Sequence, residues 1–153
     1  LQPERPAFTV HRLDRAANGL ILVAHSKKIA AALSELFRER KVEKRYRALV
    51  AGDFSTHPDP LRFEQPVDDK EAVSEFSLQE VSADKQNSLV EVCIETGRKH
   101  QIRRHLAELG HPVIGDRLYG AGEADGVDLQ LTAYLLAFRC PLADRPVEYR
   151  LQG

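Results

Sequence analysis

One acidic side chain stands out for its surroundings. Asp14 lies between Arg12 and Arg15 in the stretch FTVHRLDRAANGLILVA, residues 8 to 24, and apolar runs flank this charged centre. A carboxylate at the end of a strand, kept ionised by a nearby cation, can act as a nucleophile or as a base. The alternative is a structural aspartate that pairs with a neighbouring arginine at a surface turn. Local sequence leaves both interpretations open.

Arginine is the natural partner for such a carboxylate, because its planar guanidinium binds both oxygens and stays charged. The candidates are Arg98, Arg103 and Arg104, in the basic segment RKHQIRRH. A second basic segment, RERKVEKRYR at residues 38 to 47, contains six basic and two acidic residues, whereas residues 53 to 84 carry nine acids. Such separated charge suggests a polyanionic partner on one face, although solvated helix surfaces would give the same pattern.

Other chemistries fit the sequence poorly. His100 and His105 are five residues apart, whereas zinc ligands on a helix are usually four apart, and neither Cys93 nor Cys140 belongs to a CxxC pair. The segment GAGEADG, residues 120 to 126, lacks the last glycine of a GxGxxG dinucleotide motif. No serine lies in a GxSxG elbow. We therefore expect no metal site and no nucleotide cofactor.

The elements that must position these residues can be predicted from patterning. Residues 8 to 13 and 19 to 25 read as strands separated by a turn at Asn18-Gly19, and Ser26 can cap a helix that runs to about Arg40. Residues 44 to 52 alternate as a strand, with Tyr46 on the same face as two small apolar residues. Further along the chain we expect strands at 72 to 81, 88 to 95 and 147 to 151, a helix at 99 to 110, and a core segment at 129 to 142 that could be either helix or strand.

These elements predict an α+β fold: a mixed, mostly antiparallel β-sheet with flanking helices. The 153 residues fit one domain, and no apolar run approaches the ~20 residues that cross a membrane. Two cysteines give no disulfide framework, so a cytoplasmic location is the default expectation. A monomer is the default expectation for the oligomeric state. The chain contains no Met, which predicts an N-terminally incomplete fragment spanning residues 1 to 153.

Four segments of the chain resemble the RluA-type pseudouridine synthases. HRLDRAANGL resembles the family signature HRLDxxTSGL, KRYRALVAG resembles KxYxAxVxG, and LQLTAYLLAF resembles LxLHAxxLxF. ETGRKHQIRRHLAELGHPVIGDRLYG is a near-complete match to TGRxHQIRxHLxxxGxPIxGDxxYG. The matches occur in family order. The resemblance implies isomerisation of a uridine within tRNA or rRNA to pseudouridine, with no metal and no cofactor.

The resemblance also implies roles for individual residues. Asp14 would be the catalytic carboxylate, Arg103 its ion-pair partner and Tyr46 the ring that stacks on the flipped uracil. An aromatic ring of this kind replaces the stacking that the base loses when it leaves the RNA. The remaining expected contacts are Leu131 beneath the base, Arg98, Lys99, Arg104 and the residues 38 to 47 on phosphates, and His11 and Arg12 shaping the loop or touching the RNA backbone.

The chain departs from the family pattern in three places. Ala17 and Asn18 replace the usual Thr-Ser, and Thr132 replaces the usual His, a position we expect to lie far from the chemistry. The family's first strands should precede residue 8 and are absent, which predicts an unpaired sheet edge. Two alternatives therefore stay open: an RNA-binding module that lacks turnover because of truncation, and a hydrolase that uses Asp14 to release uracil.

Overall fold

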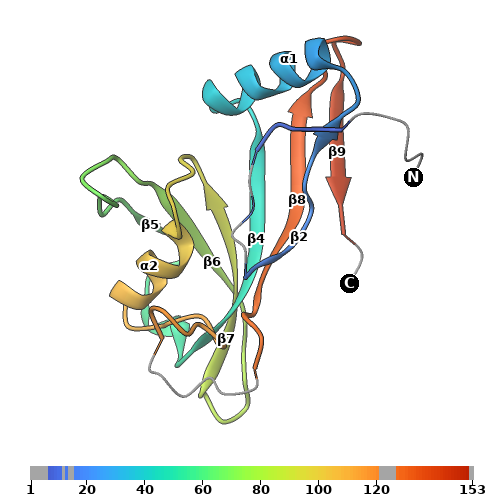
Figure 1. Ribbon diagram of the computed structural model, residues 1–153. Helices are drawn as coiled ribbons and strands as arrows, with labels where there is room; N and C mark the ends of the chain where they lie inside the picture. The colour runs from blue at the N-terminus through green and yellow to red at the C-terminus, as the bar shows by residue number, and fades with distance from the viewer. Residues whose placement is uncertain (1–6, 12, 14–15, 121–126, 152–153) are drawn as a thin grey trace.

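The computed structural model describes residues 7–11, 13, 16–120 and 127–151. Its main sheet runs in the order β2-β8-β4-β7-β6-β5, with β9 also pairing with β8, and most of its pairings are antiparallel (Figure 1). This arrangement confirms the predicted α+β class. The elements are β1 (Phe8–Thr9), β2 (Asn18–Gly19), β3 (Val23–Ala24), α1 (Lys27–Arg38), β4 (Glu43–Ala51), a 3-10 turn (Phe54–Thr56), β5 (Leu61–Phe63), β6 (Ser74–Val81), β7 (Asn87–Ile94), α2 (Gln101–Glu108), β8 (Leu131–Arg139) and β9 (Pro146–Arg150).

Strand β4 lies at the centre of the sheet and pairs antiparallel with β7 on one side and β8 on the other. Its side chains alternate as predicted. Ala48 and Val50 are completely buried, and Tyr46 packs against the same hydrophobic cluster. Helix α2 adds Ile102 and Leu106 to that cluster, so one face of β4 is covered by α2.

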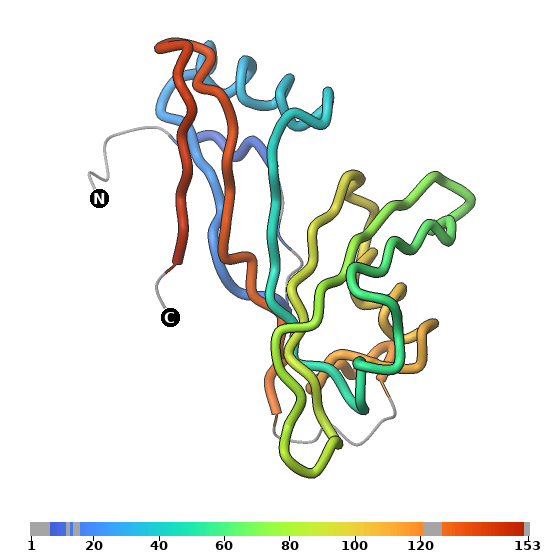
Figure 2. The backbone as a smooth tube through the Cα atoms, turned by 180° about the vertical axis from the view of Figure 1, so that it is seen from behind, coloured from blue at the N-terminus to red at the C-terminus, as the bar shows by residue number. Residues whose placement is uncertain are grey.

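Helix α1 begins where the sequence predicts. The side chain of Ser26 accepts a hydrogen bond from the backbone N–H of Ile29 at 3.1 Å, which satisfies one of the free donors of the first turn. The apolar stripe of the helix packs with residues of β1, β3 and β8 in a second hydrophobic cluster. Strand β8 runs beside β4 (Figure 2) and contributes Leu131 to the first cluster and Leu136 and Phe138 to the second. This strand therefore connects the two parts of the core.

The predicted turn at Asn18-Gly19 is wrong. These residues form β2, which pairs parallel with β8 in the register Asn18–Thr132 and Gly19–Ala133. Gly19 has a φ of +122°, and a Cβ at this position would lie 2.2 Å from the carbonyl oxygen of Ala133. The permissive backbone of glycine thus allows a close approach between strands rather than a reversal of the chain. The strands predicted on either side are reduced to the two-residue pair β1 and β3.

The ambiguous segment after residue 128 is a strand. Leu131, Ala133 and the three residues that follow are all buried, so apolar side chains occupy both faces of β8. Neighbours cover the strand because Leu131 belongs to the first cluster and Leu136 to the second. A strand covered on both faces loses the alternation that would have distinguished it from a helix.

Candidate active site

A cavity of about 550 Å³ lies between the end of α1 and the start of α2. Of the nine site residues predicted from the sequence, seven are described by the structure, and six of these line this cavity. They come from four separate stretches of the chain and are His11, Tyr46, Arg98, Lys99, Arg103 and Leu131. The fold therefore gathers in one place residues that are up to 120 positions apart.

The other three residues predicted from the sequence are Asp14, Arg12 and Arg104. Asp14 and Arg12 lie outside the described residues, and so does the expected ion pair between Asp14 and Arg103. Arg104 does not line the cavity: its guanidinium pairs with Asp68 at 2.9 Å and donates a hydrogen bond to the hydroxyl of Tyr119 at 3.0 Å. In this structure Arg104 stabilises the segment that follows α2.

Tyr46 enters the cavity from β4 at an irregular point of the sheet. The pairing of β4 with β8 shifts by one residue between Arg45 and Tyr46, because Tyr134 of β8 has no partner on β4, whereas β4 stays in continuous register with β7. Leu131, which is 3% exposed, lies opposite Ala48 in the same ladder and belongs to the same hydrophobic cluster. An aromatic ring and an apolar side chain thus form adjacent parts of the cavity wall.

Arg103 is held by an aspartate that the sequence interpretation did not single out. Its Nε and Nη2 donate to the two carboxylate oxygens of Asp116 at 2.9 and 2.7 Å, and both side chains are almost completely buried. Burial alone raises the pKa of Asp116, but the hydrogen bonds from Arg103 and from the backbone N–H groups of Tyr119 and Leu118 outweigh it and lower the pKa below its ordinary value. The aspartate therefore stays ionised and fixes the orientation of the guanidinium.

Tyr119 is a second residue that sequence reasoning missed. Its hydroxyl lies 2.8 Å from Nδ1 of His100, a cavity residue, and its ring centre lies 5.3 Å from the guanidinium carbon of Arg103. Both Asp116 and Tyr119 lie in GDRLYG, within the third resembling segment. The signal that could have found them is an aspartate in an irregular, glycine-rich segment next to apolar residues, where a buried charge needs a partner.

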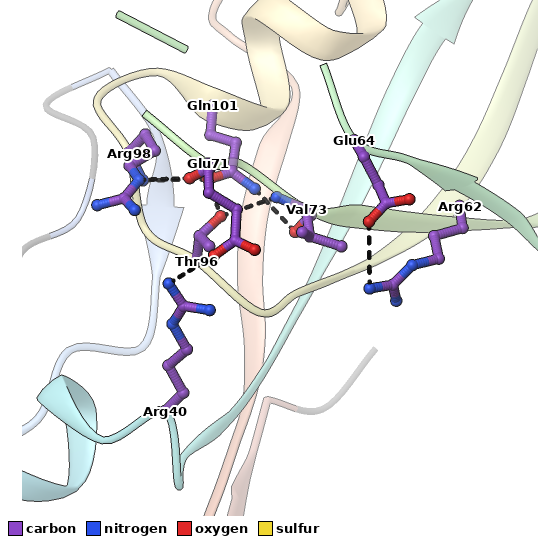
Figure 3. A network of polar contacts seen from close by, with 8 residues as sticks. All are labelled: Arg40, Arg62, Glu64, Glu71, Val73, Thr96, Arg98 and Gln101. Atoms are coloured by element: carbon purple, nitrogen blue, oxygen red, sulfur yellow. Dashed lines mark hydrogen bonds and ion pairs between the residues drawn. The ribbon is translucent and has the colours of Figure 1, made fainter. Parts of the chain in front are cut away.

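The loop before α2 is fixed by a compact polar network (Figure 3). Gln101 accepts hydrogen bonds from the hydroxyl of Thr96 and the backbone N–H of Arg98, and its amide donates to the carbonyl oxygen of Val73. Nε of Arg98 donates to the carbonyl oxygen of Glu71, whose carboxylate pairs with Arg40 at 2.9 Å. This network ties the cavity wall to the strand β6 region and to the turn after α1.

His11 is held by contacts with α1 and with Leu22. Its ring stacks on Phe37 of α1, with centroids 4.5 Å apart and planes 11° apart. Its Nε2 accepts a hydrogen bond from the backbone N–H of Leu22 at 2.8 Å. The ring is thus packed against the fold while it also lines the cavity, and a role of His11 in shaping the loop or contacting RNA stays a prediction.

Two of the departures from the family pattern contact each other. The hydroxyl of Thr132 donates to the side-chain oxygen of Asn18 at 2.6 Å, across the parallel pairing of β2 and β8. Asn18 is four positions after Asp14, so this contact links Thr132 to the strand that follows Asp14 in the sequence. Because Asp14 lies outside the described residues, the expectation that Thr132 lies far from the chemistry stays a prediction. This hydrogen bond holds the end of the Asp14 segment against β8.

The two histidines of the α2 region serve different purposes. His105 is completely buried, with Nε2 2.7 Å from the carbonyl oxygen of Gln65 and Nδ1 2.9 Å from the hydroxyl of Ser74. His100 instead lines the cavity. Among the residues that the structure describes, no group of three or more His, Cys, Asp or Glu side chains is arranged to hold a metal ion.

Comparisons with known proteins agree on one family. Residues 2–108 match the family described as RNA pseudouridylate synthase. An uncharacterized RNA pseudouridine synthase of Aquifex aeolicus is 40% identical over 129 residues, which cover 76% of this chain and 40% of the relative. The dual-specificity RNA pseudouridine synthase RluA of Salmonella typhimurium is 36% identical over 164 residues, which cover 95% of this chain and 73% of the relative.

A solved structure extends the similarity to three dimensions. Human RNA pseudouridylate synthase domain containing 1 superimposes with a TM-score of 0.84 at 26% identity, over 97% of this chain and 69% of that one. The chain spans only part of its curated relatives, including 58% of a tRNA pseudouridine synthase C of Haemophilus ducreyi that is 36% identical over 78% of this chain. No described helix has the length and apolar character that crossing a membrane requires. The family match over most of the sequence and these identities show that the chain belongs to the RluA-type RNA pseudouridylate synthases.

Proposed function

We propose that the chain is the catalytic part of an enzyme that converts a uridine within tRNA or rRNA to pseudouridine, with Asp14 as the catalytic carboxylate. The observation that carries this proposal is the convergence of Tyr46, Arg103 and Leu131 on one basic cavity. Family membership supplies the reaction class, and the cavity supplies groups suited to an extruded base.

Each group has a physical role in this reaction. The target uridine leaves its stack, and the ring of Tyr46 replaces the lost stacking while Leu131 forms an apolar floor. Arg103, oriented by Asp116, pairs with Asp14 and keeps it ionised. Either role of Asp14, attack on the sugar or removal of a ribose proton, requires the anionic form. The N-glycosidic bond between base and sugar breaks, the base turns, and a ring carbon of the uracil forms the new bond to the same sugar carbon. That ring carbon loses its proton and the former glycosidic nitrogen gains one, so the reaction is an isomerisation.

The test compares the wild-type chain with Asp14→Asn on unmodified tRNA transcripts and on rRNA from cells that lack the gene. Pseudouridine and free uracil are measured by mass spectrometry, and RNA affinity is measured over a series of salt concentrations. We expect the wild type to form pseudouridine and Asp14→Asn to form none, with RNA affinity largely kept.

The other results would each overturn the proposal in a specific way. Salt-sensitive RNA binding by a wild type that forms no pseudouridine identifies an RNA-binding module without turnover. Release of free uracil by the wild type identifies a hydrolase. Pseudouridine formation by Asp14→Asn removes Asp14 from the chemistry.

A further inference from the structure

Lys44 belongs to the basic segment 38 to 47, which the resemblance assigns as a whole to phosphates, and its own side chain lines the cavity. It lies on β4 two positions before Tyr46, so both side chains leave the same face of the strand, and both line the cavity. The ammonium nitrogen reaches across to the loop before α2, where a Cβ on Gly97 would lie 3.3 Å from it. The cavity thus presents this charge next to the proposed stacking ring.

Within the described part of the chain, the charge of Lys44 has no carboxylate partner. Among the residues the structure describes, no carboxylate forms an ion pair with Lys44, whereas the cavity residues Arg38, Arg40 and Arg103 pair with Glu35, Glu71 and Asp116. Burial lowers the pKa of Lys44 below its ordinary value, Cys93 opposes this shift and Arg40 adds to it. A partly buried ammonium in this condition is stabilised when an anion enters the cavity.

We propose that Lys44 binds the backbone phosphate next to the extruded nucleotide, and this assignment rests on the proposed function. Alternate positions on a strand are about 7 Å apart. A nucleotide whose base stacks on Tyr46 carries its phosphates one sugar away from that base, a separation that Lys44 can span. Lysine binds phosphate as a compact charge, and the absence of a side chain at Gly97 leaves room for the ammonium and its ligand.

The probe is an RNA hairpin whose seven-nucleotide loop has one central uridine among adenosines, and affinity is measured by fluorescence anisotropy. Lys44→Met keeps the apolar stem and removes the charge, and we expect it to weaken binding about tenfold. Because the variant also removes a desolvated charge, its thermal midpoint should equal or exceed that of the wild type. Lys99→Met is the control: it removes an exposed charge from the same cavity and should weaken binding less.

Two further hairpins locate the phosphate, each with a neutral methylphosphonate at the linkage before or after the uridine. We expect a methylphosphonate at one of these linkages to weaken binding by the wild type and by Lys99→Met, compared with the unmodified hairpin. Lys44→Met should bind that modified hairpin as well as it binds the unmodified one. Equal binding by wild type and Lys44→Met, whether tight or absent, overturns the assignment, as do additive losses at both linkages. Pseudouridine formation is not measured here, so a failure of the proposed function is detected separately in the turnover experiment above.

Discussion

Arg103 and Arg104 are neighbours on α2, and each pairs with an aspartate in a different environment. The Arg103–Asp116 pair has side chains that are 5% and 0% exposed, whereas those of the Arg104–Asp68 pair are 28% and 64% exposed. When a buried pair loses one partner, the remaining charge is left without solvation by water. When an exposed pair loses one partner, water solvates the remaining charge. The two pairs therefore allow a matched comparison on one helix.

We expect Asp116→Asn to lower the free energy of unfolding by about 3 kcal/mol, because the guanidinium of Arg103 stays buried while it loses the carboxylate that binds two of its nitrogens. Asp68→Asn should lower it by at most about 1 kcal/mol. Urea unfolding of the two variants and the wild type at neutral pH measures both values. Similar small losses in the two variants would show that Asp116 is not needed to stabilise Arg103.

At the scale of residues, the sequence predicts which side chains line the cavity but does not predict which side chains pair with each other. Arg103 and Tyr46 could be predicted as cavity residues because each lies in a segment that resembles the family. The pairing of Arg103 with Asp116 could not be predicted, because it depends on how an irregular segment folds back on α2. Sequence patterns describe periodic elements, and a contact across an irregular segment follows no period.

At the scale of elements, the short strand β2 fixes the end of the Asp14 segment to β8. Gly19 makes this pairing possible because any larger residue would meet the backbone of Ala133. The sequence predicted a turn here because Asn-Gly usually supplies a positive φ for chain reversal. The positive φ is present, but the structure uses it for contact with a strand more than a hundred positions away. The helices were easier to predict, since capping and apolar stripes are local signals.

Gly19→Ala should destabilise the protein more than Gly110→Ala, which is the matched control. Both glycines have positive φ values, +122° and +89°, but only Gly19 has backbone atoms within 4 Å of the added Cβ. The control isolates the cost of the backbone conformation, about 1 kcal/mol, and the steric clash at Gly19 should add at least about 2 kcal/mol. Thermal and urea unfolding give the difference, and pseudouridine assays should show an additional loss for Gly19→Ala alone. Equal destabilisation of the two variants would mean that the pairing of β2 with β8 does not contribute to the free energy of unfolding.

At the scale of the whole molecule, a buried polar chain joins the sheet, α2 and the segment between β5 and β6. The amide of Gln101 donates to the hydroxyl of Ser74, that hydroxyl lies 2.9 Å from Nδ1 of His105, and Nε2 of His105 lies 2.7 Å from the carbonyl oxygen of Gln65. These partners fit a neutral imidazole, with Nε2–H donating to Gln65 and Nδ1 accepting from Ser74. Packing between these elements therefore depends on the protonation state of one buried ring.

This dependence predicts that the protein loses stability in mild acid. Burial lowers the pKa of His105 below its ordinary value, although the hydrogen bond to Gln65 and the charge of Glu108 act in the opposite direction. The unfolded chain then binds a proton more readily than the folded one, so the free energy of unfolding falls as the pH drops below about 6.5. His105→Gln keeps an amide donor for Gln65 but cannot titrate, and urea unfolding at pH 7 and pH 5 should show a smaller decrease than in the wild type. If His105→Gln loses as much stability between the two pH values as the wild type, another group causes the acid sensitivity and the buried chain is not its origin.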